Sequence, residues 1–217
     1  MKAKPSIPQI VEFLFDALYL SVVLVLGVYL LVVIQSEIST MWGIMALVLV
    51  VGDAFHLIPR MIAVFDKTEG RYLFAQGLGK MLTSITMTVF YLLLWHCGLH
   101  IFLLQLPLCT AFVYALAITR IVLCLCPQNG WTQIQSAYKW AIYRNIPFVM
   151  QGALVLWLYV CYGTAFTALH LMWLAIALSF LFYIPVVLFA SKYPKLGMLM
   201  LAKSCAYVWI VIIGMAL

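Results

Sequence analysis

Three ionisable side chains, Asp53, His56 and Arg60, lie within an apolar stretch of the sequence. His56 and Arg60 follow Asp53 by three and seven residues, so on a helix all three share one face. A charge at the centre of a bilayer costs roughly 2.5–3.5 kcal/mol even on permissive insertion scales. Since a charge kept at that cost usually faces a cavity lined by protein, we predict a functional site here.

The composition is that of an integral membrane protein. Of the 217 residues, 67% are hydrophobic and 8% are charged, and the mean hydropathy is +1.16. A soluble domain is nearer to about half apolar and a quarter charged. No polar stretch is long enough to fold separately, so we predict one all-α transmembrane domain over residues 1–217. The plasma (inner) membrane is its expected location.

Apolar runs of about 20 residues predict transmembrane helices. Seven such runs are present, separated by short segments such as Gln35-Ser36-Glu37 and His96-Cys97-Gly98. The predicted spans are 10–34, 41–65, 72–96, 99–125, 141–163, 167–190 and 196–217. We therefore predict a bundle of seven transmembrane helices.

The distribution of basic residues predicts how this bundle is oriented. With seven spans, eight of them fall near one membrane face: Lys2, Lys4, Lys67, Arg71, Lys139, Arg144, Lys192 and Lys195. The opposite connections, around 35–40, 97–99 and 163–167, contain no Lys or Arg. The positive-inside rule then places the N-terminus in the cytoplasm and the C-terminus outside. Scattered singly among apolar segments, these residues argue against nucleic acid as a partner.

Three further basic residues, Lys80, Arg120 and Lys203, lie inside predicted spans 3, 4 and 7. With Asp53, His56 and Arg60 they fall at mid-depth or in the predicted cytoplasmic half. We predict that they surround a pocket open to the cytosol or inner leaflet. In this pocket the cations would bind the phosphate of an anionic amphiphile, and the apolar outer half would accept its chain.

Simpler interpretations stay open for each of these side chains. Arg60, Arg120, Lys80 and Lys203 could extend their charges to the membrane interface. Asp53 could be a structural ion-pair partner of Lys80, Arg120 or Lys203, and His56 could be a hydrogen-bonded core residue.

The sequence does not indicate a metal or another cofactor. His96 and His100 have the spacing of metal ligands on a helix, but Gly98 predicts a turn between them. No acid follows Glu69 to complete such a site. A retinal Schiff base at Lys203 would lack an acidic counter-ion in predicted span 3.

One segment resembles a known family. Val51-Gly52-Asp53-Ala54, followed by Leu57 and Pro59, resembles the Gly-Asp motif of the lysoplasmalogenase (YhhN) family. Phe90–Trp95 and Tyr114–Leu116 are similar to apolar segments of that family. The resemblance implies a small membrane enzyme that hydrolyses the vinyl ether bond of lysoplasmalogens. That family usually has eight spans and a second intramembrane Asp in its C-terminal half, both of which this sequence lacks.

The resemblance implies that Asp53 is a general acid that protonates the vinyl ether at carbon before water attacks. His56 would orient Asp53 or the water, and the phosphate would be held by Arg60, Lys80, Arg120 and Lys203. If two carboxylates are needed, the second must be Asp16 in the first span. The alternative is a carrier or receptor for an anionic solute or lipid, with Asp53 as the proton-coupling residue.

Overall fold

The computed structural model describes residues 6–66, 71–133 and 137–217, and all regular structure within these ranges is helical. Seven helices in these ranges are long and apolar enough to cross a membrane, as predicted. They are α1 (Ile7–Tyr29), α2 (Glu37–Phe65), α3 (Leu73–Ile101), α4 (Pro107–Leu125), α5 (Tyr138–Tyr162), α6 (Met172–Phe189) and α7 (Leu199–Gly214). Short helical turns accompany them: η1 (Leu30–Ile34), η2 (Pro127–Asn129), η3 (Gly163–Ala165) and η4 (Pro194–Met198).

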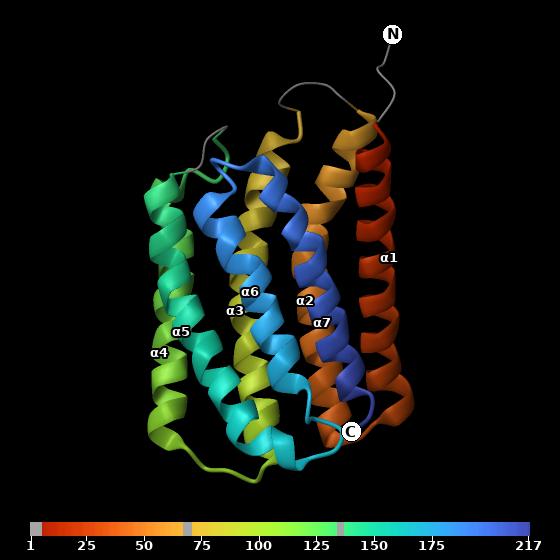
Figure 1. Cartoon of the computed structure of the whole chain (residues 1–217), viewed down its shortest axis with the longest axis vertical. Coiled ribbons are helices and arrows are strands. Elements are labelled where there is room, and N and C mark those ends of the chain that lie inside the picture. The colour runs from red at the N-terminus through yellow and green to blue at the C-terminus, as the bar shows by residue number, and fades with distance from the viewer. Residues whose placement is uncertain (1–5, 67–70, 134–136) are drawn as a thin grey trace.

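The helices stand side by side in one bundle (Figure 1). α1, α2 and α7 pack together on one side, α4 and α5 on the other, and α3 and α6 lie between them. α1 begins at one end of the bundle and α7 finishes at the opposite end, as an odd number of spans requires. We call the end at which α1 begins the N-terminal end. That this end faces the cytoplasm stays a prediction.

Charged side chains gather at the N-terminal end. Arg71 donates a hydrogen bond to the Asp66 carboxylate (2.9 Å), and the Tyr72 hydroxyl donates to the same group (2.8 Å). This hydrogen bond raises the pKa of Tyr72. The same end carries Lys139, Lys192 and Lys195. Lys2, Lys4 and Lys67 lie outside the described residues.

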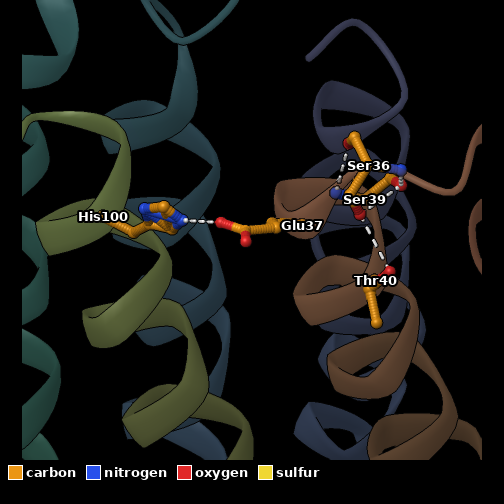
Figure 2. Close-up of polar contacts among 5 residues, drawn as sticks. All are labelled: Ser36, Glu37, Ser39, Thr40 and His100. Carbon is orange, nitrogen blue, oxygen red and sulfur yellow. Dashed lines mark hydrogen bonds and ion pairs between the residues drawn. The ribbon is translucent and has the colours of Figure 1, made fainter.

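The structure corrects several predicted helix boundaries; α4, for example, begins at Pro107 rather than at residue 99, and α6 begins at Met172 rather than at residue 167. α2 begins at Glu37 rather than at residue 41, because Ser36 and Ser39 cap each other's backbone N–H groups (Figure 2). His96-Cys97-Gly98 is not a connection, since α3 continues to Ile101. Gly98 is buried where α3 meets α5, and a Cβ atom there would lie 2.7 Å from a methyl carbon of Leu158. Gly98 therefore permits close helix packing rather than a turn.

The bundle has an aromatic core and an apolar exterior. Fully buried rings fill the centre: Trp42, Phe90, Tyr91, Trp95 and Tyr159. Large apolar side chains are exposed on the outer helices, for example Leu14, Leu18, Val25, Ile118 and Val122. An apolar exterior around buried polar groups is what a bilayer requires of a helical bundle.

α2 and α3 approach each other closely beside the predicted site. A Cβ atom at Gly79 of α3 would overlap the backbone of α2 at His56. One turn further along α3, the Thr83 hydroxyl donates a hydrogen bond to the Gly52 carbonyl oxygen (2.8 Å). The two glycines thus fix the register of α2 against α3, and with it the positions of Asp53 and His56.

We expect Gly79→Ala to lower the stability of the protein, because the new methyl group must push two helix backbones apart. Overpacking of this kind costs about 1–3 kcal/mol. Gly197→Ala is a matched control, since a methyl group at that position would meet no atom of the described residues within 4 Å. Thermal unfolding in detergent should show a lower melting temperature for Gly79→Ala alone. Equal melting temperatures would contradict the close approach of α2 and α3.

Candidate functional site

A cavity of about 430 Å³ lies among α2 to α7 toward the N-terminal end of the bundle. Its volume is within the range of roughly 300–1,000 Å³ typical of small-molecule sites. Basic side chains from four helices line it: Lys80, Arg120, Arg144 and Lys203. The residues of the described ranges that line it include no Asp or Glu. We call this space the basic cavity.

Arg120 of α4 is the most deeply buried of these cations, with 1% of its surface exposed. Its guanidinium carbon lies 3.3 Å from the ring centroid of Phe148. Neither Nε nor Nη1 has a hydrogen-bond partner within the described part of the chain. Buried guanidinium nitrogens without a hydrogen-bond partner are costly, so their presence beside a cavity points to a ligand that supplies negative charge.

Lys203 of α7 is also buried; it lines the basic cavity and interacts electrostatically with Asp53. Its ammonium nitrogen is 4.3 Å from the ring centroid of Tyr183 and 5.0 Å from that of Tyr207. It is attracted by Asp53 and repelled by Arg120. Lys203 therefore lines the basic cavity and interacts with a carboxylate outside it.

Arg144 of α5 lines the cavity but is held by the protein itself. It donates a hydrogen bond to the Asn129 side-chain oxygen (2.8 Å), and its guanidinium lies 4.1 Å from the ring centroid of Trp131. The fully buried Asn129 in turn donates to the Leu123 carbonyl oxygen (2.6 Å). Arg144 thus ties the α4–α5 connection to α5. For the exposed Lys80 side chain, no hydrogen bond or ring contact of this kind is found among the described residues.

Asp53 points toward α1 rather than into the basic cavity, and the described residues that line the cavity do not include it. Tyr19 of α1 donates a hydrogen bond to Asp53 Oδ2 (2.6 Å). Asp16, one turn before Tyr19 and 4% exposed, interacts electrostatically with Asp53. We call Asp16, Tyr19 and Asp53 the acidic group. Lys203 is the cation that links it to the basic cavity.

His56 lines the basic cavity, but it forms no hydrogen bond with Asp53 in the described structure. Its Nδ1 atom is buried and has no hydrogen-bond partner within the described residues. Two cations of the same cavity, Lys80 and Lys203, act on it electrostatically. His56 is therefore placed to contact a ligand in the cavity rather than to orient Asp53.

Arg60 has a partner outside the basic cavity. Its guanidinium forms an ion pair with Glu12 of α1, and both side chains are about one-third exposed. Arg60 is not among the described residues that line the cavity. The structure thus brings Lys80, Arg120, Lys203 and His56 to one space and leaves Asp53 and Arg60 at the α1 side of α2.

The two histidines at the opposite end of the bundle bind different partners. His100 lies 3.3 Å from Glu37 Oε2, across the space between α3 and α2 (Figure 2). His96 shares a hydrogen bond of 2.9 Å with the Tyr114 hydroxyl of α4. Groups of three His, Cys, Asp or Glu side chains able to hold a metal are absent from the described residues.

Sequence reasoning missed several residues of the site. The sequence predicts Arg144 only for the basic membrane face, and no motif in it singles out Asn145, Phe148 or Tyr183. Tyr19 could be predicted to lie beside Asp16, because a spacing of three residues places both on one face of a helix.

Comparisons of the chain with protein-family models, with curated proteins and with solved structures found no match. The resemblance of the Gly-Asp segment to the lysoplasmalogenase family therefore stays a prediction. The geometry of the basic cavity and the acidic group is the basis for assigning a function.

Proposed function

We propose that this chain is a membrane protein, of the plasma (inner) membrane, that binds an anionic amphiphile with its phosphate or other oxyanion in the basic cavity. The observation that carries the proposal is Arg120, a buried guanidinium with two nitrogens that lack a partner among the described residues. An oxyanion would accept charge-assisted hydrogen bonds from both. It would also relieve the repulsion between Arg120 and Lys203. No carboxylate comes from the described lining, so the ligand supplies the counter-charge.

The position of Asp53 favours a carrier or receptor over an enzyme. Asp53 is not among the described residues that line the basic cavity. It attracts Lys203, however, and Lys203 does line the cavity. The carboxylate and a bound anion therefore compete for the same ammonium group. Protonation of Asp53 frees Lys203 for the anion, and anion binding favours that protonation by the same free energy. In this proposal Asp53 is the proton-coupling residue.

A lysoplasmalogenase-like hydrolase is the second candidate, and the acidic group supports it. Asp16 and Asp53 provide two interacting carboxylates, although the second comes from α1 and not from the C-terminal half. A proton held between them would supply the general acid for the vinyl ether carbon. Release of an aldehyde from a lysoplasmalogen, lost in Asp53→Asn and kept in Glu37→Gln at the opposite end, would support this activity.

Binding of a short alkyl phosphate tests the proposed function directly. Purified protein in nanodiscs of zwitterionic lipid is expected to bind butyl phosphate saturably and to unfold at a higher temperature with it. A ligand at about 100 times its Kd stabilises the folded state by about 2.7 kcal/mol. Butyltrimethylammonium, with the same chain and opposite charge, should have no effect. Equal responses to both compounds would show that the cavity does not select anions.

A further inference from the structure

A second hollow, an apolar groove of about 280 Å³, lies between α5 and α6. Aliphatic side chains from both helices line it, among them Ile146 and Val149 of α5 and Ile184 of α6. Ile146 is half exposed on the outer surface of the bundle, where the bilayer lies. Asn145 and Tyr183 are the polar members of the described lining.

The groove adjoins the basic cavity. Asn145, Tyr183 and Val187 line both spaces. The Tyr183 hydroxyl donates a hydrogen bond to Asn145 Oδ1 (2.7 Å), and its ring lies 4.3 Å from the Lys203 ammonium nitrogen. One aromatic ring thus separates the apolar groove from a buried cation.

A proline interrupts the backbone hydrogen bonds of each helix beside the groove. α5 contains Pro147 and α6 contains Pro185, each in the helix interior and within the stretch that lines the groove. Each proline removes one backbone hydrogen bond from its helix. Each helix can therefore bend at the level of the groove.

We propose that the groove holds the hydrocarbon chain of the ligand whose oxyanion lies in the basic cavity, and that this ligand enters from the bilayer between α5 and α6. The proposal rests on the proposed function. It commits to one occupant, an alkyl chain joined to an anion, because an apolar groove beside a cavity lined by Lys203 and Arg120 complements both parts of such a molecule. The chain then lies at the N-terminal end, and not in the opposite half as predicted from the sequence.

A tryptophan that fills the groove tests this proposal. Ile184→Trp is expected to weaken binding of dodecyl phosphate about tenfold or more, the equivalent of about two displaced methylene groups. It should leave binding of butyl phosphate unchanged, since the short chain does not need the groove. Val149→Trp, from the facing helix, should act in the same way. Leu181→Trp is the matched control, because Leu181 lies on α6, is 61% exposed and is not among the described residues that line the groove.

The two ligands separate failure of this proposal from failure of the proposed function. If both groove variants bind dodecyl phosphate as tightly as the wild-type protein does, the proposal is overturned. The groove then holds ordinary bilayer lipid and not the chain of the ligand. An equal loss of dodecyl and butyl phosphate binding in both would also overturn it. If the wild-type protein binds neither phosphate, the basic cavity is not an anion site, and both proposals fail.

Discussion

Arg120→Met is expected to weaken binding of butyl phosphate about 100-fold or more while raising the melting temperature of the ligand-free protein. The affinity falls because two charge-assisted hydrogen bonds, at about 1.5–3 kcal/mol each, are lost. The stability rises because methionine removes a buried charge whose Nε and Nη1 have no partner among the described residues, and it still fills the space beside Phe148. Titration of the purified variant and its thermal unfolding without ligand measure the two effects.

Arg144→Met is the matched control, because Arg144 lines the same cavity but has partners within the protein. Its loss leaves the buried Asn129 oxygen without this donor, at a cost of about 1–3 kcal/mol. The two variants should therefore shift the melting temperature in opposite directions, although both lose a cavity cation. A destabilised Arg120→Met would assign Arg120 to the structure of the fold and remove the main support for an anion site.

The span count could be predicted from the sequence, whereas the ends of the helices could not. Seven apolar runs suffice to count membrane-length helices, because the length of a span is set by the bilayer. Gly98 shows why the ends are harder to predict. A glycine near the expected end of a span fits a turn, but it equally fits a close contact with another helix. Only the position of Leu158 on α5 decides between these two roles.

The convergence of cations was predictable, but their individual partners were not. Lys80, Arg120 and Lys203 have similar predicted depths on three spans, and the structure places all three beside one cavity. Arg60 has a comparable depth, yet it is drawn to Glu12 because α1 packs on that face of α2. The rotation of each helix about its axis decides such pairings, and depth along the sequence does not encode it.

Asp53→Asn is expected to tighten binding of butyl phosphate about fivefold or more at neutral pH, the lower range of a typical coupling between two sites. The change removes the negative charge that competes with the ligand for Lys203. Asparagine still offers an oxygen to the Tyr19 hydroxyl, so the contact between α1 and α2 is kept. Affinities of both proteins measured under identical conditions give the ratio.

The assignment of this effect to Lys203 requires a double-mutant cycle. In a Lys203→Met background, Asp53→Asn should no longer change the affinity, because the ammonium group for which the carboxylate and the ligand compete is gone. Tyr19→Phe, which removes the hydrogen bond but keeps the carboxylate, should not tighten binding in either background. If Asp53→Asn tightens binding equally with and without Lys203, Asp53 acts through the general field of the bundle and not as a proton-coupling residue. If it leaves binding unchanged but abolishes aldehyde release from a lysoplasmalogen, the acidic group is catalytic, and the hydrolase replaces the carrier as the function of this chain.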